Sequence, residues 1–118
     1  MHRFEDLKVW QNAIQLVKEV YLILPNMPKE EKYAISEQIR RSAVSIPSNI
    51  AEGAGRNNNG EFYHFLGIAN ASANELMTQL ILIKELGLIN GFDPSMKIEN
   101  IKLIQNMIYK LQLTLKKS

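Results

Sequence analysis

Residues 40–56 read RRSAVSIPSNIAEGAGR, and a proline at position 47 stands inside what is otherwise one amphipathic helix. Proline removes a main-chain hydrogen bond and its ring presses on the carbonyl four residues earlier, which kinks a helix. Apolar residues nevertheless recur at steps of three and four on both sides of Pro47, in one unbroken phase; they are Ile35, Ile39, Ala43, Ile46, Ile50 and Ala54. The pattern therefore predicts one helix bent at Pro47, not two helices with a loop between them.

Asn49 lies on the side of this helix that also carries Ser42, Ile46 and Gly53. We expect its amide to face inward, where it needs hydrogen-bond partners and could serve carbonyls or side chains left open near the bend. The alternative is that Asn49 is solvated in a wide groove.

Similar apolar stripes predict three further helices, at about 7–24, 58–86 and 94–115. Asp6 is a candidate N-cap for the first, and Asn58 with Glu61 has capping-box spacing for the third. The second helix is expected to begin close to Pro28 and to end at Gly53, Gly55 and the run 57–60. Further boundary signals are Gly87 or Asn90-Gly91 after the third helix and Asp93-Pro94 before the fourth.

No alternating strand pattern, internal repeat or low-complexity tract interrupts the four stripes, and the connections are short. The sequence therefore predicts an all-α fold: a single domain over residues 1–118, built as an up-down-up-down antiparallel four-helix bundle with a proline-kinked second helix.

Additional apolar residues flank three of the stripes; they are Val9, Leu16 and Ile23, then Met77, Ile81 and Leu88, then Met96, Leu103 and Met107. They indicate either burial against another subunit or simply a wide core face.

Composition excludes several classes of function. The 118 residues contain no cysteine, so disulfide frameworks, thiolate zinc sites and cysteine nucleophiles are ruled out. No apolar run is long enough to span a bilayer, and the first residues carry acids where a signal peptide would be apolar, so we expect a cytoplasmic protein. Lys plus Arg exceeds Asp plus Glu by only 14 to 12, so attraction to nucleic acid would require clustered charge.

No catalytic, cofactor or metal motif is present. The segment Gly53-Ala54-Gly55 lacks the third glycine of a dinucleotide fingerprint and the lysine of a phosphate loop. The serines of residues 42–48 lack the turn of a nucleophile elbow, and two histidines, His2 and His64, do not form a helical metal motif. We expect no enzyme, no cofactor and no metal.

The arginines around the quoted stretch are the candidate nucleic-acid contacts. Arg40, Arg41 and Arg56 lie on or near one helix and could meet phosphate groups. The alternative is intrahelical ion pairing, because Glu37 precedes Arg41 by four residues and Glu52 precedes Arg56 by four.

Three segments, YAISEQIRRSAVSIPSNIAEGAGR, FEDLKVWQNAIQLVKEVY and EFYHFLGIANASANELMTQL, resemble the 23S rRNA intervening sequence proteins, also called S23 ribosomal proteins. The resemblance extends over nearly the whole chain. It implies a four-helix bundle, commonly assembled as a ring-like homopentamer, with genes often inside rRNA gene inserts, and it implies no established activity. A related branch is the accessory variability protein of diversity-generating retroelements, a basic pentamer that partners a reverse transcriptase and binds nucleic acid. This chain differs from that branch in being barely basic.

Two hypotheses of different class follow. The first is a non-enzymatic module that acts on RNA or rRNA through Arg40, Arg41 and Arg56. The second is a structural homo-oligomer that docks a protein partner, such as a reverse transcriptase, with the arginines in intersubunit salt bridges. A basic face on the assembled ring would favour the first hypothesis, and a neutral surface would favour the second.

Overall fold

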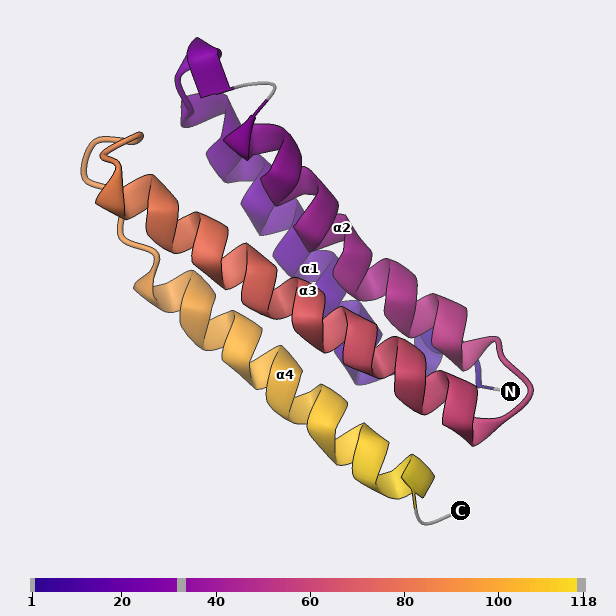
Figure 1. Cartoon of the computed structure of the whole chain (residues 1–118). Helices are drawn as coiled ribbons and strands as arrows, with labels where there is room; N and C mark the ends of the chain where they lie inside the picture. Colours follow the sequence, from indigo (N-terminus) through magenta and orange to yellow (C-terminus); the bar gives the residue numbers. More distant parts are fainter. Residues whose placement is uncertain (1, 32–33, 117–118) are drawn as a thin grey trace.

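The computed structural model describes residues 2–31 and 34–116, and in that part of the chain it contains four α-helices (Figure 1). They are α1 (Lys8–Ile23), α2 (Ile35–Ala54), α3 (Asn59–Glu85) and α4 (Ser95–Lys116). Short 3₁₀ helices, η1 (Phe4–Asp6), η2 (Leu24–Asn26) and η3 (Lys29–Glu31), precede α1 and connect it to α2. The predicted all-α, up-down four-helix fold is confirmed.

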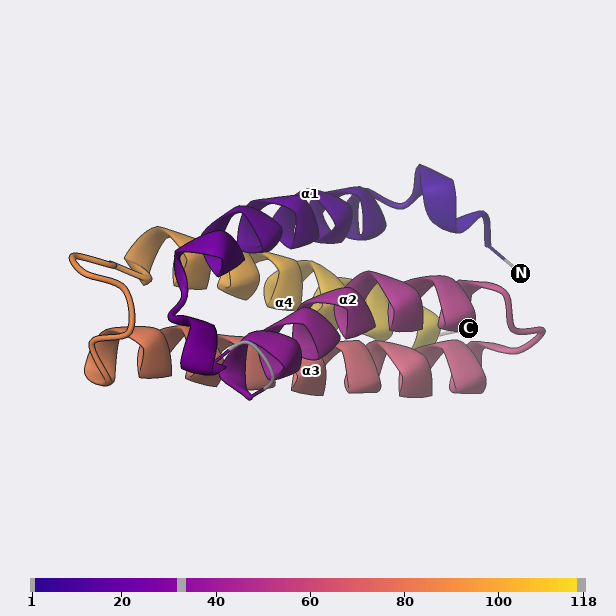
Figure 2. The ribbon, with the colours of Figure 1, turned by 90° about the horizontal axis from the view of Figure 1, so that it is seen from above.

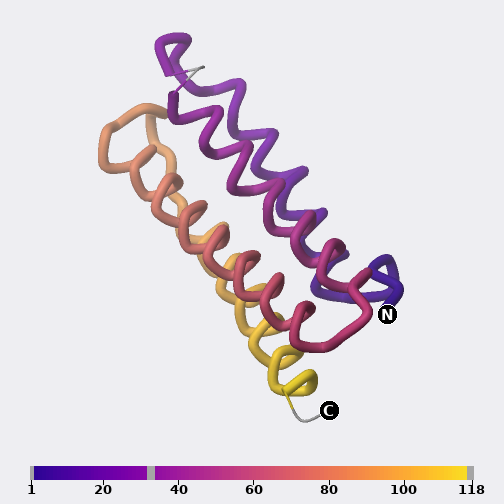
Figure 3. The backbone as a smooth tube through the Cα atoms, turned by 45° about the vertical axis from the view of Figure 1, so that its right-hand side comes forward, coloured from indigo at the N-terminus to yellow at the C-terminus, as the bar shows by residue number. Residues whose placement is uncertain are grey.

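The helices form a closed square in cross-section, because each packs against the next and α4 packs back on α1. The chain reverses direction at each connection, and α1 and α3 occupy opposite sides with α2 and α4 between them (Figures 2 and 3). The bundle measures 48 × 23 × 19 Å. Its core takes residues from all four helices, and those buried most completely include Ile39, Ile46, Ile50, Phe62, Leu66, Leu76, Leu80, Ile83, Ile101 and Ile108.

Helix α2 continues through Pro47, which is buried. Asn49 is half-buried, and its side-chain amide donates to the carbonyl oxygen and to the hydroxyl of Ser45, both at 2.8 Å. The amide thus has partners on the helix itself, one turn before it. The bend at Pro47 stays a prediction, which the test of Pro47→Ala below addresses.

Two helix beginnings differ from the sequence prediction. Asp6 is not an N-cap, because it lies in η1 and pairs with Arg3 at 3.2 Å, while α1 starts after Leu7 without a side-chain cap. Helix α2 begins at Ile35, not near Pro28, because residues 29–31 form the separate turn η3. Acidic residues at positions 30 and 31 suit a helix start in general, but here they belong to this short 3₁₀ turn.

Gly53 does not end α2, which extends to Ala54. A Cβ atom at Gly53 would lie 2.7 Å from the Cβ of Phe65 and 2.8 Å from Cδ1 of Phe62, so this glycine allows α3 to approach closely. The sequence around Gly53 alone cannot show whether this glycine ends the helix or makes room for α3, because the need for a small residue comes from α3.

Three other helix ends follow their sequence signals. Asn58 caps α3 by accepting the backbone N–H of Glu61 at 2.8 Å, and its amide donates to the Glu61 carboxylate. Gly87, with φ of 63°, closes α3 in a Schellman motif in which the Leu88 N–H donates to the carbonyl of Ile83. Before α4, the hydroxyl and the backbone N–H of Ser95 donate to Asp93, and these bonds lower the pKa of Asp93.

The flanking apolar positions divide between the two interpretations. Val9 and Leu16 belong to the core of the bundle, so for them the wide-core interpretation is correct. A second group is half-buried against the core: Ile23, Met77, Leu88 and Met107. A third group is exposed: Ile81, Met96 and Leu103. Tyr21 of α1 is also exposed.

Candidate interaction surfaces

Arg40 and Arg41 lie near the start of α2 and share one carboxylate. Arg40 Nη1 is 3.3 Å from Glu37 Oε2, and Arg41 Nε is 3.7 Å from Glu37 Oε1. The Arg40 guanidinium also lies 6.0 Å from the centre of the Tyr21 ring. Arg41 is 80% exposed, so it is the more available of the two for an outside partner.

Arg56 follows α2 at the opposite end of the bundle. Its Nη2 lies 2.7 Å from Glu52 Oε1, and its guanidinium lies 4.7 Å from the centre of the Phe65 ring. Arg40 and Ala54, the last residue of α2, are separated by fourteen residues of helical rise, about 21 Å at 1.5 Å per residue, and Arg56 lies two residues further on. The structure therefore brings Arg40 and Arg41 together but leaves Arg56 apart, and each of the three has a carboxylate partner.

An apolar groove runs along the outer side of α1 and α2 and encloses about 290 Å³. No charged residue lines this α1/α2 groove; its lining residues are Phe4, Trp10, Ile14, Val17, Val44, Pro47, Ser48 and Ala51. Phe4 and Trp10 stack edge to face at 5.0 Å, and Val44 is 40% exposed. The groove is an exposed apolar surface of the kind that proteins use for association.

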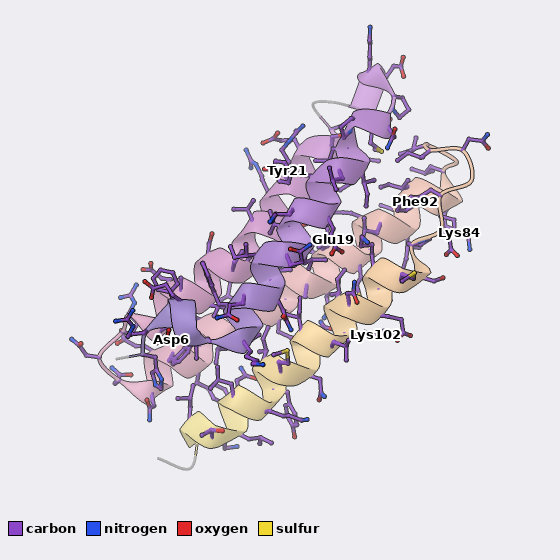
Figure 4. The ribbon with its side chains drawn as sticks, turned by 180° about the vertical axis from the view of Figure 1, so that it is seen from behind. Asp6, Glu19, Tyr21, Lys84, Phe92 and Lys102 are labelled. Carbon is purple, nitrogen blue, oxygen red and sulfur yellow. The ribbon has the colours of Figure 1, made fainter. Side chains whose placement is uncertain are left out.

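A second surface, the α1/α4 surface, contains a hollow of about 230 Å³ between these helices; it is lined by Asn12, Gln15, Leu16, Glu19, Asn100, Leu103 and Ile104. Glu19 faces α4 and accepts from Lys97 at 3.1 Å (Figure 4). The hydrogen bond from Gln15, then that from Lys97, lowers the pKa of Glu19. Leu103 is 61% exposed and Met96 is 77% exposed, so this surface also presents apolar groups to solvent.

The α3/α4 surface carries amides and tyrosines. Gln105 donates to the side chain of Asn74 at 2.8 Å, and Gln112 donates to the carbonyl oxygen of Tyr63 at 3.2 Å. Tyr63 and Tyr109 are both exposed. The sequence interpretation missed this surface because it searched for arginines; the signal was the excess of lysine over acidic residues within 95–116.

In the described part of the chain, no three His, Asp or Glu side chains come close enough to hold a metal ion. His2 packs at a tilt against Phe62 and His64 packs edge to face against Phe65, at centroid distances of 5.0 and 5.7 Å. Ser42 donates to Gln79, and Ser45 pairs with Ser72. Over the described ranges, no helix has the length and apolar character needed to cross a bilayer.

Comparison with known proteins gives one family match. The family model described as 23S rRNA-intervening sequence protein matches residues 5–110, which is most of the chain. No curated protein matches the sequence.

Proposed function

Since the chain belongs to the 23S rRNA-intervening sequence protein family, we propose that it is a non-enzymatic helical module that assembles into a closed homo-oligomeric ring. Five subunits is the number that the family resemblance implies. The observation that carries the proposal is the presence of two different exposed apolar surfaces, the α1/α2 groove and the α1/α4 surface with Leu103 and Met96.

The two surfaces differ in composition. The α1/α2 groove carries no charge, whereas the α1/α4 surface combines the exposed side chains of Leu103 and Met96 with the Glu19–Lys97 ion pair. A groove on one copy that receives a different exposed patch of the next copy makes a heterologous contact, which produces rings or open filaments. The two surfaces lie on adjacent sides of the bundle and share α1. Each subunit is therefore rotated relative to the one before it, which favours a closed ring over an open filament.

Light scattering tests this proposal. We expect a mass several times the 13.5 kDa of one chain. A charge placed in either surface should disrupt the ring, because burying an unpaired carboxylate is costly. The variants are Val44→Glu for the groove and Leu103→Glu for the α1/α4 surface. The matched control is Ala71→Glu, on an exposed position of α3 outside both surfaces.

Mixing the two disrupted variants distinguishes a heterologous contact from an isologous one. Each variant keeps one intact surface, so the mixture should form one productive junction and a dimer of two chains. A mixture that stays at the mass of one chain would contradict the head-to-tail arrangement. A wild-type mass of one chain at micromolar concentration would overturn the proposal.

Pro47 lines the groove, which links the predicted bend at this residue to assembly. Pro47→Ala restores an N–H that can bond the Ala43 carbonyl, so α2 should straighten and its helicity should rise. We expect assembly to weaken at the same time, measured by light scattering beside circular dichroism. Unchanged assembly would show that Pro47 does not contribute to the interface between subunits.

RNA contact through Arg40, Arg41 and Arg56 is a second candidate, favoured by the high exposure of Arg41. Its alternative is a ring that docks a protein partner and no nucleic acid. Gel shifts with structured RNA at about 50 mM salt separate the two, because phosphate contacts give a steep salt dependence. Replacement of the three arginines by alanine should flatten that dependence; the absence of any complex favours the protein-docking alternative.

A further inference from the structure

Helix α4 has a larger net positive charge than the chain as a whole. Residues 95–116 contain four lysines against one glutamate, a net charge of +3, whereas the whole chain has +2. Lys97 is engaged with Glu19, but no carboxylate of the described residues lies within 4.0 Å of Lys102, Lys110 or Lys116. These three side chains thus present unneutralised charge, and Lys102 projects away from the bundle (Figure 4).

Lys102, Tyr109 and Lys116 are spaced at seven residues and therefore lie on one side of α4. They span about 21 Å at 1.5 Å per residue. Tyr109 is 58% exposed, so a large aromatic ring stands in solvent between two lysines. Core packing does not account for this ring.

Amides border the same row. Gln105 and Gln112 use their NH₂ groups to bond α3, which fixes both side chains along the junction of the two helices. Within residues 2–31 and 34–116, the side-chain oxygens of both amides accept no hydrogen bond. Because Gln112 bonds the main chain of Tyr63, a second exposed tyrosine lies beside the row.

We propose that this α4 stripe, consisting of Lys102, Tyr109, Lys116, Tyr63, Gln105 and Gln112, binds single-stranded RNA. The lysines contact phosphates, the tyrosine rings stack on bases, and the amide oxygens accept from base edges. Charge complementarity indicates a polyanion, and the exposed rings favour unpaired bases over a duplex, whose bases are already stacked. An acidic peptide would satisfy the lysines but would leave the rings and amides without a role.

The stripe is separate from Arg40, Arg41 and Arg56 and lies on the α3/α4 surface, which the proposed ring does not cover. Its occupancy is therefore independent of ring closure, although a ring would place several copies of the stripe on one particle.

Fluorescence anisotropy with labelled single-stranded RNA of about 12 nucleotides, within the usual range of site sizes, tests the inference. Loss of one stacking ring typically weakens binding at least about fivefold, so we expect this from Tyr109→Ala. Tyr109→Phe keeps the ring and should bind as wild type does. The double variant Lys102→Ala, Lys116→Ala should lower the slope of log affinity against log salt by about 1.4, and Lys18→Ala on α1 is the control.

Three results would overturn the inference: no binding of the RNA at about 50 mM salt, unchanged affinity of Tyr109→Ala, or equal competition by duplex RNA or by polyglutamate. Light scattering of each variant keeps this test distinct from that of assembly. A variant that loses RNA binding but keeps the assembled mass supports RNA binding by the α4 stripe. A variant that keeps RNA binding but has a lower assembled mass bears only on the proposed ring.

Discussion

The α2–α3 contact differs from the α1–α4 contact in the side chains and hydrogen bonds that form it. Where α2 meets α3, small residues allow close approach and a buried polar row joins the helices: Ser42 Oγ donates to Gln79 Oε1 at 2.6 Å, and Ser45 Oγ lies 2.8 Å from Ser72 Oγ. Where α1 meets α4 in the described residues, the polar links lie near the surface. They are the Glu19–Lys97 ion pair and a 3.3 Å contact from Asn12 to the sulfur of Met107.

This difference indicates that the bundle has a tight half and a loose one. Buried hydrogen bonds between α2 and α3 are costly to break because each freed group stays away from water. Solvent-screened links between α1 and α4 contribute little. We therefore expect the α2–α3 pair to be the last to open on unfolding, and the α1–α4 contact to be the first.

The largest effect should come from Gly53→Val. Its side chain would meet Phe65 Cβ and Phe62 Cδ1 below 3.0 Å, and the Phe65 Cβ cannot rotate away. We expect a loss of about 3 kcal/mol in the free energy of unfolding, at the upper end of overpacking effects. Urea unfolding followed by circular dichroism measures it.

Gly55→Ala is the matched control, because nothing approaches its Cβ position closer than 3.7 Å and its φ is −81°. Its stability should equal or exceed that of wild type. Equal losses for the two glycines would show that helix propensity, and not the close approach of α3, decides the outcome.

A smaller effect should follow from Ser42→Ala. The variant leaves the buried Gln79 side chain without its partner, which costs about 2 kcal/mol. The double variant Ser42→Ala, Gln79→Leu removes both polar groups and should recover much of the loss. A double-mutant cycle in urea measures the coupling; strictly additive losses would mean that the hydrogen bond does not hold α2 to α3.

The smallest effect concerns Glu19. The hydrogen bond from Gln15 and then the contact with Lys97 lower its pKa, so these contacts stabilise the fold above the ordinary carboxyl pKa. Their contribution is lost as pH falls through the lower folded value. Glu19→Gln should cost about 0.5 kcal/mol near neutral pH and nothing in acid. Unfolding midpoints measured across that range test this, with the exposed Glu99→Gln as control. A pH-independent difference in stability would exclude the contacts of the Glu19 carboxylate with Gln15 and Lys97 as its source.

Much of the fold could be predicted from local patterns, because apolar spacing and end caps are short-range signals. The cap at Asn58, the helix end at Gly87 and the continuation of α2 through Pro47 could be predicted without knowing which helices lie nearby. Gly53 was misjudged, since its environment is set by α3, and the choice between the two interpretations of Leu16 needed the interior of the bundle. The candidate surfaces were harder still, because the sequence shows that arginines are near glutamates but not which lysines are left unpaired.

The two ends of the described chain leave the bundle at the same end (Figure 1), where the His2 N–H donates to the carbonyl oxygen of Ala54. A force applied between them would thus pull the first turns of α1 and the last turns of α4 sideways, away from each other. The helices would be peeled apart turn by turn instead of being sheared along their length, and the resistance met first would be that of the weakest contact in the bundle. Under tension, we expect this domain to yield gradually at low force, although its α2–α3 half is tightly packed.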